Sequence, residues 1–282
     1  MAQSIGFRGA CVGVLALVAA LGSTAVSARS LSDLDAADQA ALQRTLVMRV
    51  AKAHIQLAAN PGEQARKTLK DSVDQYDRSL VLLEENSPNS QINQRIMKVK
   101  QLWQAYRSQA LSQPAHSSVL AMLEQSNNLL FQSDALVRDW KARLPQHVGE
   151  RSELAQQQGM LSERAGVYFA AHNYGIHEPW VLEEMRYSMR AYENGLTELR
   201  EIAAANGETR ALTQLDTQWH ALRSGLQQTN ASNTAPAMAA VESLYQQSGE
   251  LGALYREDDR MVIRHGHGPR LDIGLAANVS AD

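Results

Sequence analysis

Apolar residues recur at intervals of three and four along most of the chain, the spacing of helices with one apolar face. The first such segment runs from about Ser32 to Ala59 and places Leu42, Leu46 and Val50 on one face. No stretch alternates convincingly between apolar and polar residues, so a sheet is not expected. The pattern therefore predicts an all-helical protein.

Helix-breaking and helix-capping residues divide this pattern into eight segments. The breaks fall at Asn60-Pro61, Ser87-Pro88, Gln113 to Ser118, Leu144-Pro145, Glu178-Pro179, Asn206-Gly207 and Asn230 to Pro236. Only three Phe and seven Pro occur in the 282 residues, a composition that favours helices.

The chain also repeats itself. Residues 43–49 and 158–164 share the pattern Gln-x-x-Leu-x-x-Arg. Further matched positions, 115 or 116 residues apart, are Tyr76 and Tyr192, Trp103 and Trp219, Arg107 and Arg223, and Ser133 and Ser248. The nearly constant offset indicates duplication of one four-helix module.

Four helices with short connections are typical of an antiparallel four-helix bundle. We therefore expect an all-α fold of two tandem antiparallel four-helix bundles, residues 29–146 and 147–260. Placed in series, with a long helix shared across the Pro145 region, the bundles would form an elongated rod. The helical pattern fails in residues 261–282, which we expect to be a flexible tail.

The first 28 residues have the order of a secretory signal peptide. Arg8 precedes an apolar run over residues 10–21, and Val26 and Ala28 fit the −3 and −1 positions of a signal-peptidase site. The run is short and rich in alanine for a membrane span. A cleaved signal and a periplasmic location are expected, the alternative being an uncleaved anchor in the inner membrane.

Composition and motifs narrow the classes of function. The net charge of −3 is spread over interspersed residues of both signs, which does not suggest nucleic-acid binding. The single cysteine, Cys11, lies within the expected signal. No nucleophile–base pair, phosphate loop, zinc signature or inward Glu-x-x-His pair is recognisable. We expect no enzymatic activity, no metal and no cofactor.

The repeated pattern resembles the PilJ/NarX-like sensor domain, the periplasmic module of type IV pilus chemotaxis transducers and nitrate/nitrite sensor kinases. Its motif reads approximately Ala-Gly-Arg-Gln-Arg-Met-Leu-Ser-Gln-Arg. The matching residues are Gln43, Arg44, Leu46 and Arg49 in the first copy, and Gln158, Met160, Leu161, Ser162 and Arg164 in the second. The resemblance implies four-helix bundles, often dimeric, that bind a small ligand near the first helix.

In the nitrate sensors of this family, an arginine contacts the anion between paired helices. The resemblance assigns that position to Arg44 in the first copy and to Gly159 in the second. Only the first copy keeps the arginine, and the Ile-Asn-x-Ala-Gly lead-in of the nitrate sensors precedes neither motif. The resemblance therefore implies at most one anion site of this kind and does not indicate nitrate specificity.

The helical face that carries Arg44 lies away from the main apolar stripe and also bears Val47, Met48 and Ala51. An apolar outer face indicates a second packing partner, either another subunit or another module. We expect a ligand site formed by Arg44, Gln43, Val47 and Met48, in which the guanidinium clamps an anion. The alternative is a solvated arginine extended over apolar neighbours.

The corresponding face of the second copy is lined by small residues and reads as a packing surface. These residues are Ala155, Gly159, Ser162 and Gly166. Arg49 and Arg164 fall on the main stripe, where each would form a structural ion pair inside its own bundle. Gln158, with these two arginines, would support the structure or the ligand.

Taken together, these features predict an exported, sensory-type module that binds a small anion or polar metabolite. No output domain is recognisable, so the module would act through a membrane receptor or signalling protein, and its outer faces would allow a homodimer. The alternative is a ligand-free periplasmic helical scaffold or interaction module.

Overall fold

The computed structural model describes residues 31–206, 209–227 and 234–265. The predicted signal at 1–28 and the tail beyond His265 lie outside the described residues. Eight helices and no strands occur in the described part of the chain. The helices are α1 (Asp33–Ala59), α2 (Glu63–Glu85), α3 (Ser90–Ala110), α4 (His116–Lys141), α5 (Glu150–Tyr174), α6 (Pro179–Asn206), α7 (Thr209–Gln227) and α8 (Thr234–His265).

The helix boundaries follow from local chemistry. The Ser32 hydroxyl accepts a hydrogen bond from the Asp35 backbone N–H and so caps α1. Asn89 caps α3 in the same way, through the N–H of Ile92. Gly175 ends α5 with a φ of 110°, a backbone conformation that glycine adopts without strain. The predicted break at Glu178-Pro179 is confirmed, because Pro179 occupies the first position of α6.

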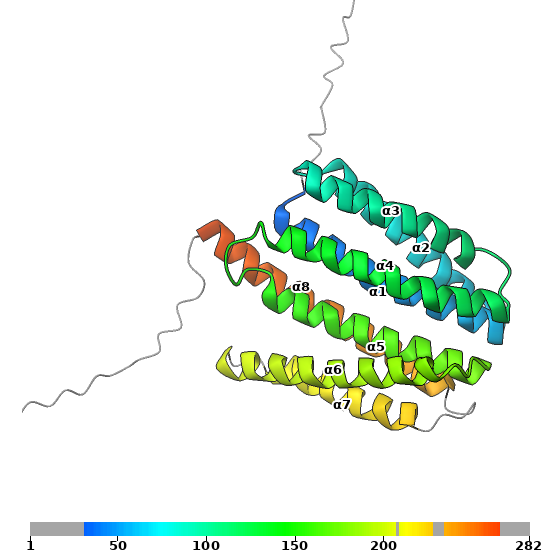
Figure 1. Ribbon diagram of the computed structural model, residues 1–282. Coiled ribbons are helices and arrows are strands. Elements are labelled where there is room, and N and C mark those ends of the chain that lie inside the picture. Colours follow the sequence, from blue (N-terminus) through cyan, green and yellow to red (C-terminus); the bar gives the residue numbers. More distant parts are fainter. Residues whose placement is uncertain (1–30, 207–208, 228–233, 266–282) are drawn as a thin grey trace, which may run out of the picture. The chain divides into compact units, whose positions relative to one another are not determined.

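Two sets of four helices pack in the same order. In the first half α1 contacts α2 and α4, and α3 contacts α2 and α4. In the second half α5 contacts α6 and α8, and α7 contacts α6 and α8. Figure 1 shows α2 and α3 on the outer side of α1 and α4, and α6 and α7 on the outer side of α5 and α8.

A repeated aromatic stack accompanies this repeated packing. Tyr76 and Trp103 stack with ring centroids 3.7 Å apart, and Tyr192 and Trp219 stack with centroids 4.0 Å apart. Each pair joins the second helix of a half to its third helix. The matched residues of the sequence repeat therefore occupy matched places in the structure.

The two halves meet along α1 and α5. These helices pack against each other, and buried apolar side chains from all eight helices form one connected cluster. α4 ends at Lys141 and α5 begins at Glu150, so no helix is shared across Pro145. The predicted end-to-end arrangement in a rod is therefore wrong, because the outer face of α1 is covered by α5.

The small-residue face of α5 lies in this central region. A Cβ atom added to Gly166 would lie 2.8 Å from a methyl carbon of Val241 on α8, so any other residue would require Val241 or α8 to shift. At the other end of the chain, α8 continues to His265. Residues 261–265 are thus helical rather than part of the predicted tail.

Candidate functional site

The residues expected to bind a ligand lie deep in the protein. Val47 and Met48 are fully buried in the hydrophobic core, and Gln43 is also fully buried. Neither polar atom of the Gln43 side chain has a hydrogen-bond partner in the described structure, and the same holds for Gln158. Both glutamines thus have the same buried setting in the two halves.

The side chain of Arg44 is only 5% exposed and is already paired with carboxylates. Its Nη1 atom lies 2.9 Å from Asp134 on α4 and 3.5 Å from Glu153 on α5. Glu153 also pairs with Lys141 at the end of α4. The guanidinium therefore links the two halves, and its Nη1 donor faces carboxylates rather than an open anion site.

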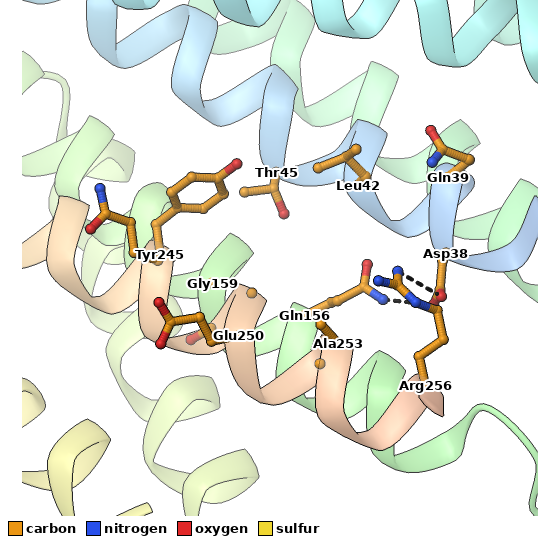
Figure 2. A pocket seen from close by; sticks show the side chains of 14 residues that line it. Asp38, Gln39, Leu42, Thr45, Gln156, Gly159, Tyr245, Glu250, Ala253 and Arg256 are labelled. Carbon is orange, nitrogen blue, oxygen red and sulfur yellow. Dashed lines mark hydrogen bonds and ion pairs between the residues drawn. The ribbon is translucent and has the colours of Figure 1, made fainter. Parts of the chain in front are cut away.

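A pocket of about 450 Å³ lies on the other side of the contact between α1 and α5. We call it the seam pocket. Its lining includes Asp38, Leu42 and Thr45 of α1, Gln156 and Gly159 of α5, and Tyr245, Ser248, Glu250, Ala253 and Arg256 of α8. In Figure 2 the backbone at Gly159 lies between the Tyr245 ring and the Gln156 side chain.

Gly159 allows α8 to approach α5 closely at the edge of the pocket. A Cβ atom at this position would lie 3.3 Å from the Cβ of Ser248 and 3.8 Å from the ring of Tyr245. A larger side chain at position 159 would extend into this region. The volume lies within the range of sites for small molecules.

One end of the seam pocket carries an ion pair. The Arg256 guanidinium donates to Asp38 at 3.1 Å, and the Gln156 amide donates to the other carboxylate oxygen at 2.7 Å (Figure 2). Burial raises the pKa of Asp38 above its ordinary value, against the opposing effects of Arg256 and Gln156. The carboxylate is thus held at the pocket by two donors from different helices.

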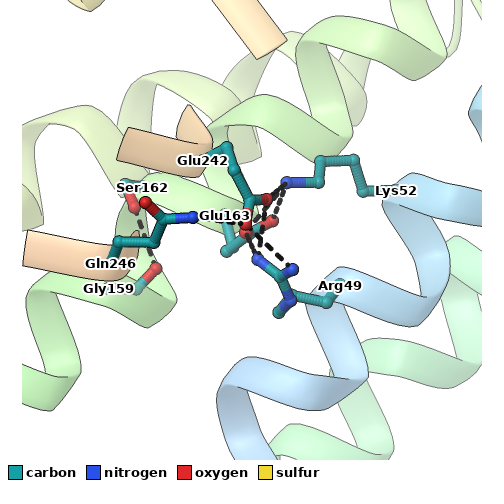
Figure 3. A network of polar contacts seen from close by, with 7 residues as sticks. All are labelled: Arg49, Lys52, Gly159, Ser162, Glu163, Glu242 and Gln246. Atoms are coloured by element: carbon teal, nitrogen blue, oxygen red, sulfur yellow. Dashed lines mark hydrogen bonds and ion pairs between the residues drawn. The ribbon is translucent and has the colours of Figure 1, made fainter. Parts of the chain in front are cut away.

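The opposite side of the pocket borders a buried charge network (Figure 3). Arg49 lies 2.8 Å from Glu163 and 2.9 Å from Glu242, and Lys52 lies 2.8 Å from Glu163. The Arg49 guanidinium also lies 3.9 Å from the centre of the Tyr245 ring. Two cations and two carboxylates from α1, α5 and α8 therefore join the halves and hold the Tyr245 wall.

The charges in this network favour its ionised state. Burial acts to raise the pKa of Glu242, but the hydrogen bond from Arg49 and the charge of Lys52 lower it overall. Burial likewise opposes the charge of Arg49, yet Glu163 and Glu242 raise its pKa. The ion pair predicted for Arg49 inside the first bundle is in fact formed with α5 and α8 of the second half.

Arg164 has a different setting. Its guanidinium lies 2.6 Å from Glu184 on α6, within the second half, and also donates to Asn127 on α4. Sequence reasoning placed both arginines on the buried stripe but had no means to identify their partners. Nor did it find the seam pocket, because Asp38, Gly159 and Arg256 lie on three helices that are distant in the sequence.

Two further features concern metal sites and membrane spans. Among the described residues no group of three or more His, Cys, Asp or Glu side chains is arranged to hold a metal ion. In the same part of the chain, no helix has the length and apolar character required to cross a bilayer.

Comparison with models of protein families gives no match, and no curated protein or solved structure matches the chain.

Proposed function

We propose that this protein is a non-enzymatic, exported ligand-binding module of the sensory type, with the seam pocket as its ligand site. In this proposal each half is an antiparallel four-helix bundle of the PilJ/NarX-like kind, and the protein acts from the periplasm through a membrane signalling partner. The observation that carries the proposal is the pocket beside Gly159, between the first helices of the two halves.

The position of the pocket suits a sensor. Its lining comes from α1 of the first half and from α5 and α8 of the second. A ligand that contacts all three helices would stabilise one arrangement of the halves over another, which is what a binding event needs to shift a conformational equilibrium. The neighbouring Arg49–Glu163 pair crosses the same boundary and would sense the change.

Arg44 serves a structural role in this proposal. Its side chain is buried against Asp134 and Glu153, whose negative charges already balance the charge of the guanidinium. We therefore assign the ligand to the pocket and not to Arg44. The ligand is a small polar molecule, because the pocket combines an apolar wall with charged groups at its ends.

Thermal unfolding with and without ligands tests the proposal. The purified protein is screened against nitrate, nitrite, other oxyanions and small polar metabolites, with Arg44→Ala in parallel. A ligand at 100 times its Kd should stabilise the protein by about 2.7 kcal/mol, a shift of several degrees. We expect the shift to persist in Arg44→Ala and to disappear in Gly159→Leu, which fills the pocket.

Gly225→Leu is the matched control, because Gly225 also lies within a helix but at a distance from the pocket. A Cβ atom at Gly225 would meet only Ala237, at 3.9 Å. Loss of the shift in Arg44→Ala with retention in Gly159→Leu would instead place the site at Arg44. No shift with any compound would contradict ligand binding.

A ligand-free interaction module is the second function with an observation in its favour. Leu254 and Met261 lie one heptad apart on α8 and are 61% and 57% exposed. Exposed apolar side chains on one helical face are typical of a protein contact. A flat ligand screen, together with loss of partner or self-association in Leu254→Ser, would favour this function.

A further inference from the structure

The seam pocket occupies the place in the second half that the Arg44 side chain fills in the first. Gly159 follows Arg44 by 115 residues, the offset of the repeat. Arg44 extends from α1 toward α4 and α5, where Asp134 and Glu153 accept its hydrogen bonds. Gly159 has no side chain, so α8 approaches α5 closely at this position, and the pocket lies beside the glycine between α5, α8 and α1.

Both the Arg44 side chain and the seam pocket have a carboxylate beside them. Glu153 lies next to Arg44, and Asp38, at the matching position, lines the seam pocket. Each of these carboxylates also pairs with a basic residue of a neighbouring helix, Glu153 with Lys141 of α4 and Asp38 with Arg256 of α8. Glu153 thus has two cationic partners, Arg44 and Lys141, whereas Asp38 has one, Arg256.

The charges around Arg44 therefore differ from those around the seam pocket. Around Arg44 two cations face the carboxylates of Asp134 and Glu153. Among the residues that line the seam pocket, Arg256 is the one Lys or Arg, while Asp38 and Glu250 are both acidic. Around Arg44 two positive charges face two negative ones, whereas the lining of the seam pocket carries one positive charge and two negative ones.

The rest of the lining fits the remaining parts of an arginine-like group. Leu42 and Tyr245 offer apolar contact to an alkyl stem. Ser248 lines the pocket, and its buried hydroxyl has no hydrogen-bond partner in the described structure. A buried polar group of this kind is stabilised when a ligand supplies the missing hydrogen bond.

We infer that the seam pocket binds a small organic cation, an alkylguanidinium or alkylammonium group, in the position that the arginine side chain takes in the first half. This inference rests on the proposed function, which makes the pocket the ligand site. The bound cation contacts Asp38 and Glu250, and its alkyl part lies against Leu42 and Tyr245.

Calorimetric titration with methylguanidinium chloride tests the inference. Methylurea is the matched neutral compound, and sodium chloride keeps the ionic strength constant. We expect binding of methylguanidinium, with little or no binding of methylurea. Gly159→Arg should abolish the binding because its own guanidinium fills the pocket, and Glu250→Gln, an exposed position, should weaken it several-fold.

The reciprocal variant gives an independent readout. Arg44→Gly removes the built-in cation of the first half and should create a second site. Methylguanidinium should then raise the thermal unfolding temperature of Arg44→Gly more than that of the unchanged protein, and methylurea should not. An equal rise in the two proteins would contradict the equivalence of the two places.

The outcomes separate the inference from the proposed function. Methylguanidinium binding that is unchanged in both Gly159→Arg and Glu250→Gln overturns the inference. A second outcome is that an anion or methylurea binds, that this binding is lost in Gly159→Leu, and that methylguanidinium does not bind. This outcome overturns the inference that the ligand is a cation but supports the seam pocket as the ligand site. Absence of binding by every compound overturns both.

Discussion

The two sides of the contact between α1 and α5 differ in what fills them. On one side Arg44 reaches across to Asp134 and Glu153 and is almost completely buried. On the other side Gly159 leaves a pocket in which Asp38 keeps its own basic partner, Arg256. A duplicated helix pair has thus kept its carboxylates on both sides but has kept the bridging cation on only one.

This comparison shows how a repeat can separate structure from binding. The side with the arginine holds the halves together through charges that the chain itself supplies. The side with the glycine retains space and a charged rim. Four substitutions test this division. Three are ordered by decreasing expected effect on the free energy of unfolding, and the fourth concerns the pH dependence of that free energy.

Glu163→Gln should cause the largest loss, about 3–5 kcal/mol, because it leaves Arg49 and Lys52 with only Glu242 in a buried setting. Urea unfolding measures the loss as a lower midpoint with an unchanged slope. Glu184→Gln is the control, since the half-buried Glu184 pairs with Arg164 inside one half. A similar loss in the two variants would show that an ion pair between the halves contributes no more to stability than an ion pair within one half.

Arg44→Met should destabilise the protein by about 2 kcal/mol, because it keeps the packed stem but leaves Asp134 and Glu153 without their shared cation. The loss is smaller than at Glu163, since Asp134 is partly exposed and Glu153 keeps Lys141. The same urea unfolding experiment measures it. A stability equal to that of the unchanged protein would show that the arginine side is not the structural side.

Gly159→Ala should change stability by less than about 1 kcal/mol. Replacing a helical glycine gains roughly 0.5–1 kcal/mol, and the tight 3.3 Å approach to Ser248 offsets part of that gain. Thermal unfolding measures the balance. A loss as large as that of Arg44→Met would show that Ser248 and Tyr245 cannot shift to accommodate the added methyl group.

The smallest effect concerns acid sensitivity and a second difference between the halves. The matched residues His54 and Phe169 are both fully buried, and burial lowers the pKa of His54 below its ordinary value. The unfolded chain therefore binds a proton more readily, so stability is full above about pH 6.5 and falls as the pH drops through the lowered pKa.

His54→Phe copies the second half and should remove this part of the pH dependence. The measurement is the difference in unfolding free energy between pH 7.5 and pH 5.5, compared with the unchanged protein. The variant also leaves the Ala110 carbonyl and the Ser118 hydroxyl without the imidazole, so its stability at pH 7.5 should be lower. Parallel pH profiles in the two proteins would contradict the assignment to His54.

Much of the local structure could be predicted from the sequence. The spacing of apolar residues located α1 to within one residue of its observed start. The repeat located the matched aromatic pairs, whose stacking the structure shows in both halves. These features depend on residues that are near one another in the chain or on one helical face.

The outer face of α1 illustrates the limit. Its apolar residues predicted a packing partner, and the structure shows that the partner is α5 of the same chain. The pattern of a single helix reports which side is apolar but not which helix covers it. The partners of Arg49, on α5 and α8, could not be predicted for the same reason.

The sequence by itself determined the helices, their duplication and the exchange of an arginine for a glycine at matched positions. Only the tertiary structure decided that Arg44 meets Asp134 and Glu153, and that Asp38, Gly159 and Arg256 line one pocket. The physical reason is that helix formation depends on local hydrogen bonds and spacing, whereas a pocket depends on which buried faces meet after the chain has folded.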